Sequence, residues 1–209
     1  MQTFKNVYIN CFEPNPHGMI IAKSLIKSIE QGNQIKVFGH PLEFGEVLIN
    51  FHEKAVSDKN SKMDFHCTYR DPRESDKKET ERTLVGDVTI AYQDFIKPYV
   101  IASDGSSLNE IIKDDVEYKT ITVETITLDS WFSDEIACKE VDLLWIDAQG
   151  HEKQVILGAT EMLKKTDFVI MEVGENKQYA GAMTEEQTVE LMKGYSFKKI
   201  KKFQSACRS

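Results

Sequence analysis

The second half of the chain alternates continuous apolar runs with amphipathic ones, and this alternation constrains the fold more than any other feature. Residues 141–146 form an apolar run broken only by Asp142, and residues 168–171 form another. Apolar residues at helical spacing follow each run, over 152–163 and over 184–193. Strands buried on both faces and separated by helices are typical of parallel sheets, which need crossover connections. We therefore predict an α/β fold, a mainly parallel sheet with helices on both faces.

The first half of the chain carries weaker signals of the same kind. An apolar run over 7–12 ends at Glu13-Pro14-Asn15-Pro16, where two prolines stop a strand, and residues 19–29 have helical spacing. A short helix over 106–113 is predicted, capped by Ser106 or Ser107. Further strands are predicted over 47–51, 55–56, 63–67, 84–90, 120–126 and 195–200. The chain length of 209 residues suits a single domain over 1–209, with a charged insertion at 69–82.

Composition excludes several classes of protein. The net charge of −8 disfavours binding to nucleic acid, which needs a basic face. No apolar run is long enough to cross a bilayer, and the first ten residues lack a secretory pattern. The four cysteines contain no CxxC pair, which favours reduced thiols. We expect a cytoplasmic protein with no nucleic-acid or membrane partner.

Three acidic residues, Glu13, Asp147 and Glu172, directly follow runs predicted as strands. In an open parallel sheet, ligands bind beyond the carboxyl ends of the strands. A carboxylate there can accept hydrogen bonds from both hydroxyls of a ribose. Glu13 fits this role best because the proline-rich turn after it fixes its direction. Capping of the next helix is an equal alternative for Glu13.

The run from Asp147 to Glu152 is the densest polar cluster that follows a predicted strand. Gly150 permits a tight turn or the close approach of a ligand. His151 is a candidate proton acceptor near neutral pH. The favoured alternative for His151 and Glu152 is an exposed first helical turn, where the dipole favours acidic charge. Asp147 is predicted to be functional, because a carboxylate flush with an apolar strand needs a partner.

Glu172 and Asp129 receive simpler interpretations. Asp147 and Glu172 are expected to end neighbouring strands, an arrangement that suits a divalent cation. Two carboxylates that face solvent or a cofactor are the favoured alternative, so no metal is predicted. Asp129 precedes Trp131 and is predicted only to cap a short helix.

Five stretches together resemble the FkbM-type methyltransferase family, in the family's order over positions 7 to 200. They are Phe12-Glu13-Pro14-Asn15-Pro16, Ala55-Val56-Ser57-Asp58, Gly105-Ser106-Ser107-Leu108, Thr127-Leu128-Asp129, and the run from Ile146 to Glu152 with Leu157-Gly158-Ala159 after it. Glu172 closes the following strand as in the family. The resemblance implies a Rossmann-like class I methyltransferase fold, S-adenosylmethionine as the methyl donor, and a small-molecule or sugar hydroxyl as the acceptor.

The resemblance also implies roles for individual residues. Glu13, with Asn15 in the same motif, would bind the cofactor and its ribose, and Ala55 and Val56 would lie near the adenine. Asp147 would face both the methyl group and the acceptor. Methyl transfer is an in-line displacement, so alignment is its main demand. His151 is the candidate base for the hydroxyl proton, although a small or apolar residue is common there in the family.

One departure from the family concerns the start of the chain. Family members carry a strand and a glycine-containing turn, Asp-x-Gly-Ala-Asn, before the Glu-Pro motif, whereas no glycine precedes Gly18 here. We therefore predict that the first strand is missing and the domain is N-terminally incomplete. A fragment, an incomplete reading frame, and a subunit completed by another polypeptide that supplies the missing strand are the three alternatives.

Two other functions compete with methyl transfer. A non-catalytic binding or interaction module that keeps the fold is the main alternative. A nicotinamide-dependent oxidoreductase ranks last, because the glycine fingerprint of such enzymes is absent.

Overall fold

A computed structural model describes residues 4–16, 18–19, 23, 36–37, 40–41, 44–70, 100–101, 106–111, 118–134, 140–173 and 179–200. The chain divides into two compact units, which are described separately below. The first contains Met1–Ala55, Ser61–Leu108 and Lys113–Thr125, and the second contains Val56–Asn60, Asn109–Ile112 and Ile126–Ser209. The single domain over 1–209 stays a prediction. The predicted insertion at 69–82 lies outside the described residues beyond Arg70.

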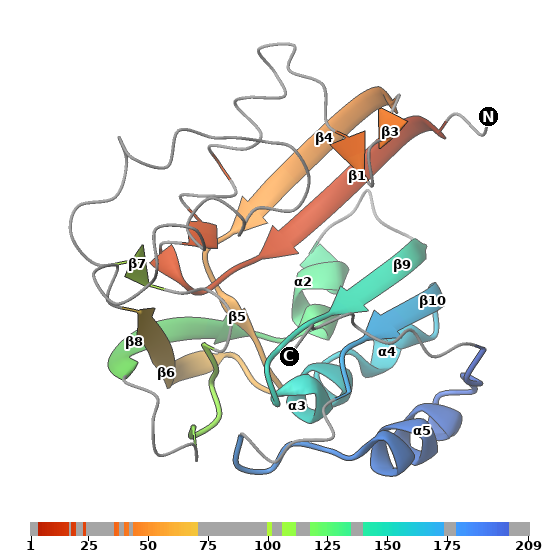
Figure 1. Ribbon diagram of the computed structural model, residues 1–209. Helices are drawn as coiled ribbons and strands as arrows, with labels where there is room; N and C mark the ends of the chain where they lie inside the picture. The colour runs from red at the N-terminus through yellow and green to blue at the C-terminus, as the bar shows by residue number, and fades with distance from the viewer. Residues whose placement is uncertain are drawn as a thin grey trace. The chain divides into compact units, whose positions relative to one another are not determined.

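The first unit contains a parallel strand pair. Strand β1 (Phe4–Phe12) pairs in parallel with β4 (Phe44–His52), and the two run side by side in Figure 1. This confirms the strands predicted over 7–12 and 47–51. A small antiparallel pair, β2 (Lys36–Val37) and β3 (His40–Pro41), lies between them in sequence.

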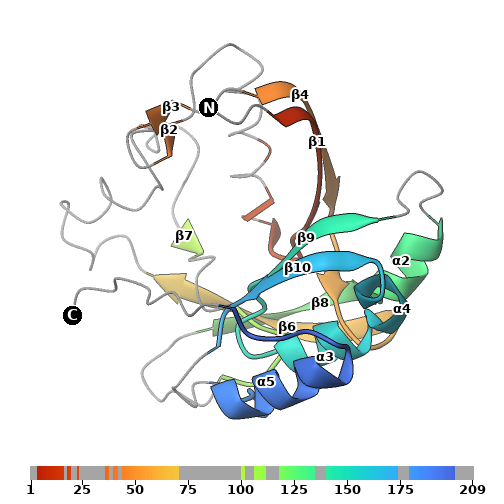
Figure 2. The same ribbon diagram turned by 90° about the vertical axis from the view of Figure 1, so that its right-hand side faces the viewer.

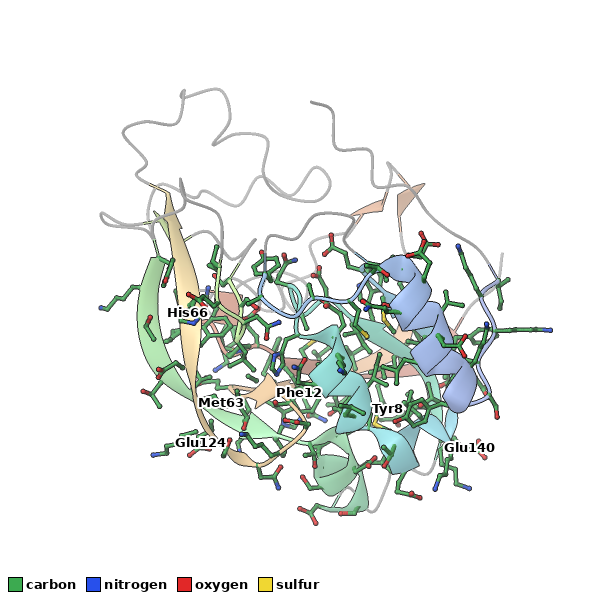
Figure 3. The ribbon with its side chains drawn as sticks, turned by 90° about the horizontal axis from the view of Figure 1, so that it is seen from below. Tyr8, Phe12, Met63, His66, Glu124 and Glu140 are labelled. Carbon is green, nitrogen blue, oxygen red and sulfur yellow. The ribbon has the colours of Figure 1, made fainter. Side chains whose placement is uncertain are left out.

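A second sheet has the order β5 (Ala55–Val56), β8 (Tyr118–Ile126), β6 (Ser61–Arg70) and β7 (Val100–Ile101). Here β6 pairs antiparallel with both β7 and β8. His66 and Met63 lie along β6 (Figure 3), and His66 Nδ1 is 3.1 Å from Thr120 Oγ1 across the pair. The prediction of a mainly parallel sheet is therefore wrong for these strands. Burial alternates along the second half of β8, which is typical of antiparallel strands with one solvated face.

The core of the first unit lies on one face of this second sheet. Ala55, Phe65, Cys67 and Val123 form a buried cluster, with Leu108 and Ile121 packed against it. Phe65 and Cys67 are two residues apart on β6, so their side chains point to the same face. Cys11 and Cys67 are both free thiols, as predicted.

The second unit contains another parallel pair, β9 (Val141–Ile146) and β10 (Thr166–Met171), which confirms the strongest strand predictions. In Figures 1 and 2, α3 (Glu152–Leu157) and α4 (Thr160–Leu163) lie along one face of the pair. On β9 and β10, four large apolar side chains in register are exposed: Leu143, Trp145, Phe168 and Ile170. Coverage of both faces by helices stays a prediction.

The helix predicted over 152–163 is divided in two at Gly158 and Ala159. A Cβ atom at Gly158 would lie 2.1 Å from the carbonyl oxygen of Ser57, so the chain approaches that backbone too closely for any side chain. The new helix α4 begins beside Asp129, and the Asp129 carboxylate accepts hydrogen bonds from three donors in its first turn. These are Thr160 Oγ1 at 2.7 Å, Glu161 N at 2.8 Å and Met162 N at 2.9 Å.

The prediction that Asp129 is the N-cap of a short helix is wrong, because Asp129 lies inside α2 (Leu128–Asp134) and its carboxylate instead binds the first amides of α4. Helix α2 is capped by Thr127, whose Oγ1 accepts from Ser130 N at 3.1 Å. The last helix, α5 (Glu185–Gly194), opens with the predicted capping box of Thr184 and Gln187.

Two predicted elements are wrong. Residues 106–111 form no helix, because their backbone groups pair elsewhere: Ser107 bridges to His66, and Ile111 bridges to Tyr179. Residues 195–200 form no strand, since Ser196 adopts a positive φ of 67° directly after α5. The predicted strand over 84–90, and most of the helix predicted over 19–29, lie outside the described residues. Nowhere in the described ranges is a helix long and apolar enough to cross a membrane.

Candidate functional site

The Glu13 turn (residues 12–16 and 18–19) follows β1 at the carboxyl end of the first parallel pair. Glu13 N donates to the carbonyl oxygen of His52 at 3.1 Å, which continues the strand pairing by one residue. Its carboxylate Oε1 accepts from Asn15 N at 2.7 Å. The ring of Phe12 stacks on His52 with 4.5 Å between centroids. The strand end and the turn together fix the direction of this carboxylate.

The Glu13 carboxylate packs against Gly18, in the position that a side chain there would occupy. A Cβ atom at position 18 would lie 2.8 Å from both Cδ and Oε2 of Glu13. Asn15 is only 1% exposed, and its Nδ2 donates to Ser106 Oγ at 3.5 Å. Asn15 therefore anchors the turn from within, and its predicted contact with a cofactor stays a prediction.

Two thiols near this turn are not nucleophiles at neutral pH. Burial raises the pKa of Cys67 to about 11, and the negative charge of Glu13 adds to that effect. Burial and Glu13 also raise the pKa of Cys11. Thiolates, not thiols, are the reactive form, so the raised pKa values disfavour reaction at both cysteines, and Cys67 packs in the buried cluster with Phe65.

Ala55 and Val56, predicted to lie near the adenine, form the short strand β5. Ala55 is 3% exposed and belongs to the buried cluster with Phe65, whereas Val56 is half-buried. Nothing in their packing tests the contact with adenine, which stays a prediction.

The Asp147 turn (residues 147–151) follows β9 in the second unit. Met171 of β10 is in register with Ile146, so Asp147 and Glu172 end neighbouring strands as predicted. Gln149 Nε2 joins the two carboxylates by donating to Asp147 Oδ1 at 2.7 Å and to Glu172 Oε2 at 3.2 Å. Burial and the adjacent Asp147 raise the pKa of Glu172. Within the described ranges, no group of three or more His, Cys, Asp or Glu side chains could hold a metal ion.

The backbone of this turn is left-handed at Gln149, with φ 49°, and at Gly150, with φ 92°. Tyr179 lies against the turn: its hydroxyl donates to Gln149 Oε1 at 2.9 Å, and its Cβ would be 2.5 Å from a Cβ at Gly150. Glu152 Oε1 accepts from Gly150 N at 2.9 Å and Ala148 N at 3.2 Å. The close approach that Gly150 permits is therefore made by Tyr179.

His151 points into the protein and is 3% exposed, and Glu152 is 8% exposed. The interpretation of these two residues as an exposed helical turn is therefore wrong. His151 Nδ1 is 2.6 Å from Asn109 Oδ1, and Nε2 is 3.0 Å from Ser57 Oγ. Burial lowers the pKa of His151 to about 4, against the opposing effect of Asp58. Its predicted role as a base stays a prediction.

Sequence reasoning did not identify Ser57, Asn109, Gln149 or Tyr179 as site residues. Ser57 lies inside one stretch that resembles the family, and Asn109 directly follows another, so both had a weak signal. Tyr179 had none, because only the fold brings it to Gly150. Glu13 and Asp147 belong to different units, and their sharing of one site stays a prediction.

Similarity to known proteins extends over most of the chain. A family model described as "Methyltransferase FkbM domain" matches residues 12–207. The curated protein "2-O-methyltransferase NoeI" of Sinorhizobium fredii (strain NBRC 101917 / NGR234) is 26% identical over 185 residues, which is 88% of this chain and 61% of the relative. The chain thus spans about three fifths of the length of that relative. No solved structure matches the chain.

Proposed function

Because the chain belongs to the FkbM methyltransferase family, we propose that it transfers a methyl group from S-adenosylmethionine to a hydroxyl oxygen of a small molecule or sugar. The name of the relative, a 2-O-methyltransferase, supports an oxygen acceptor. The observation that carries the proposal is the Glu13 carboxylate, fixed at the end of a parallel strand by the amide of Asn15 and by close packing on Gly18. A non-catalytic module is not favoured by the family match or by the name of the relative.

The finer fold belongs to the same proposal. A Rossmann-like class I sheet contains two parallel strand pairs on either side of a first strand. The parallel pairs β1–β4 and β9–β10 are consistent with that arrangement.

The residues of the Glu13 turn fit the ribose of the cofactor. A carboxylate has acceptor positions on both oxygens. A vicinal diol can therefore donate to Glu13 while Asn15 N holds Oε1 at 2.7 Å. Ala55 and Val56 are the apolar residues that we assign to the adenine. When bound, S-adenosylmethionine would supply an activated methyl group.

Asp147 is the residue that we assign to the acceptor. Its side chain is exposed at the end of β9, and Gln149 fixes its orientation through Oδ1. A carboxylate held in this way accepts a hydrogen bond from the acceptor hydroxyl and takes up its proton during transfer. His151, the other predicted base, is 3% exposed and hydrogen-bonded through both ring nitrogens, so it does not contact the acceptor in this proposal.

Calorimetry of S-adenosylmethionine binding tests the cofactor site. Glu13→Gln keeps the shape of the side chain but removes its charge and one acceptor oxygen, so we expect affinity to fall about tenfold. Glu53→Gln is the matched control, because Glu53 is exposed and pairs only with Lys23 among the contacts described for it. No heat and no thermal shift at millimolar cofactor with the wild-type chain would contradict the proposal.

Formation of S-adenosylhomocysteine tests the assignment of Asp147. With a panel of sugars and hydroxylated metabolites as acceptors, Asp147→Asn should keep cofactor affinity and lose about a hundredfold in rate. Equal rates for the wild type and the variant would remove Asp147 from the mechanism.

A further inference from the structure

Three polar side chains from distant parts of the sequence form a buried network beneath the Asp147 turn. Ser57 is 0% exposed, His151 is 3% exposed and Asn109 is 9% exposed. The imidazole lies between the other two, with Nδ1 2.6 Å from Asn109 Oδ1 and Nε2 3.0 Å from Ser57 Oγ. Buried polar groups are costly unless they are hydrogen-bonded, so such a network must be satisfied to be stable.

The contacts of Asn109 determine the proton positions in this network. Its Nδ2 donates to the carbonyl oxygens of Gly150 at 2.7 Å and Ala180 at 2.8 Å. A carbonyl can only accept, so these two contacts fix which end of the amide is nitrogen and use both of its hydrogens. The other end, Oδ1, can only accept, and therefore Nδ1 of His151 carries a proton. In the neutral imidazole Nε2 is then an acceptor for the Ser57 hydroxyl at 3.0 Å, and Asp58 Oδ1, 3.2 Å from Ser57 Oγ, is a second acceptor for the same proton.

The same amide also ties the Asp147 turn to the segment that contains Tyr179. Ala180 N donates to the carbonyl oxygen of Glu110 at 2.9 Å, next to the bond between Asn109 and Ala180 O. Tyr179 is thereby held against Gly150, where its hydroxyl reaches Gln149 Oε1 at 2.9 Å. Gln149 in turn donates to Asp147 and Glu172. A continuous chain of contacts runs from Asn109 to the carboxylate of Asp147.

We propose that Asn109 is a positioning residue for methyl transfer: it holds His151 as the neutral imidazole protonated at Nδ1, and it fixes the turn that presents Asp147 to the acceptor. This inference rests on the proposed function. Asn109 and His151 act through the turn and touch neither the acceptor nor the cofactor. Burial, which lowers the pKa of His151 to about 4, agrees with a neutral ring at physiological pH.

Nitrogen-15 NMR of the full chain labelled at histidine tests the proton positions directly. The His151 signal is assigned by its loss in His151→Gln. We expect Nδ1 to show the shift of a protonated nitrogen and Nε2 that of an unprotonated one, unchanged between about pH 7.5 and about pH 5.5. A ring protonated at Nε2, or one that titrates in this range, would overturn the inference.

Kinetics of Asn109→Asp test the positioning role. The new carboxylate still accepts from His151 Nδ1, but it cannot donate to Gly150 O or Ala180 O and repels both. We expect kcat to fall by about tenfold to a hundredfold, with the dissociation constant of S-adenosylmethionine unchanged. The carboxylate should also make His151 titrate at a higher pH, a spectroscopic change that a loss of stability alone does not produce. Asn50→Asp is the control and should change none of these quantities, because Asn50 is exposed on β4 and the side-chain contact described for it is the hydrogen bond that it donates to Asn10 Oδ1 at 3.2 Å.

Further outcomes separate this inference from the proposed function. An Asn109→Asp chain that is folded and keeps the wild-type kcat would defeat it. If that variant does not fold, Ser57→Ala replaces it: loss of the donor to Nε2 should alter the His151 spectrum and lower kcat, and an unchanged spectrum would count against the network.

A wild-type chain that binds cofactor but methylates none of the acceptors would defeat the proposed function. A ring protonated at Nε2 in an active chain would defeat this inference alone.

Discussion

The Glu13 turn and the Asp147 turn both follow a strand of a parallel pair, yet the contacts that fix the two turns differ. The Glu13 carboxylate is held within a few residues, by the amide of Asn15 and by packing against Gly18. The Asp147 carboxylate also has a local partner, Gln149, but the turn around it is fixed by side chains from distant segments, among them Tyr179 and Asn109. The comparison teaches that a turn fixed by neighbouring residues can be recognised in a sequence. A turn fixed by residues far apart in the sequence can be recognised only once the fold is known.

The difference between local and distant contacts is clearest at Gly18 and Gly158. A Cβ at Gly18 would meet the far end of the Glu13 side chain at 2.8 Å, and one at Gly158 would meet the backbone carbonyl of Ser57 at 2.1 Å. A side chain can rotate away, but a backbone segment can only shift as a whole. Gly158→Ala should therefore destabilise the protein by about 3 kcal/mol or more, the largest effect that we expect. Urea unfolding measures it.

Gly194→Ala is the matched control for that experiment. Nothing lies within 4 Å of a Cβ at Gly194, in the last turn of α5. Alanine is a better helix former, so this variant should be as stable as the wild type or slightly more stable. Equal stability of Gly158→Ala and Gly194→Ala would show that the Ser57 segment is not packed on Gly158.

The second-largest effect that we expect is a loss of stability at low pH, and it comes from His151 in the Asp147 turn. The pKa of His151 falls from 6.5 to about 4 on folding, so between these values the unfolded chain binds a proton that the folded chain does not. Stability is therefore complete above pH 6.5 and decreases as the pH falls toward 4, by up to about 3 kcal/mol from this residue. Urea titrations at a series of pH values measure the slope. His151→Gln should reduce that slope, and an identical slope in the variant would contradict the buried neutral ring.

Gly18→Ala should give the smallest change in stability but a specific change in binding. The added methyl group displaces the Glu13 carboxylate rather than the backbone, so the free energy of unfolding should change by less than about 1 kcal/mol. The affinity for S-adenosylmethionine should nevertheless fall about tenfold, because the carboxylate leaves its position. If calorimetry shows wild-type affinity, the orientation of Glu13 does not matter for the cofactor.

The predictable parts of this protein are those in which neighbouring residues decide the outcome. Continuous apolar runs predicted β9 and β10, the proline turn predicted the end of β1, and Thr184 with Gln187 predicted the start of α5. The helix expected over 106–113 failed because its backbone pairs with His66 and Tyr179, which local sequence does not reveal. Asn109 and Tyr179 were missed as site residues for the same reason. The break at Gly158 depends on the carbonyl of Ser57, about a hundred residues earlier.

Trp145 lies on the exposed apolar face of β9 and β10, so its fluorescence can be used to detect binding at that face. The sequence has two tryptophans, and they lie in opposite environments: Trp131 in α2 is 8% exposed, and Trp145 on β9 is 69% exposed. An indole in water emits at longer wavelength than one in a protein interior, so the two contribute to different parts of the fluorescence spectrum. Iodide should quench Trp145 and spare Trp131. A partner that binds that face of β9 should therefore change the long-wavelength emission of Trp145. The short-wavelength emission of Trp131 should stay constant as long as the core is intact.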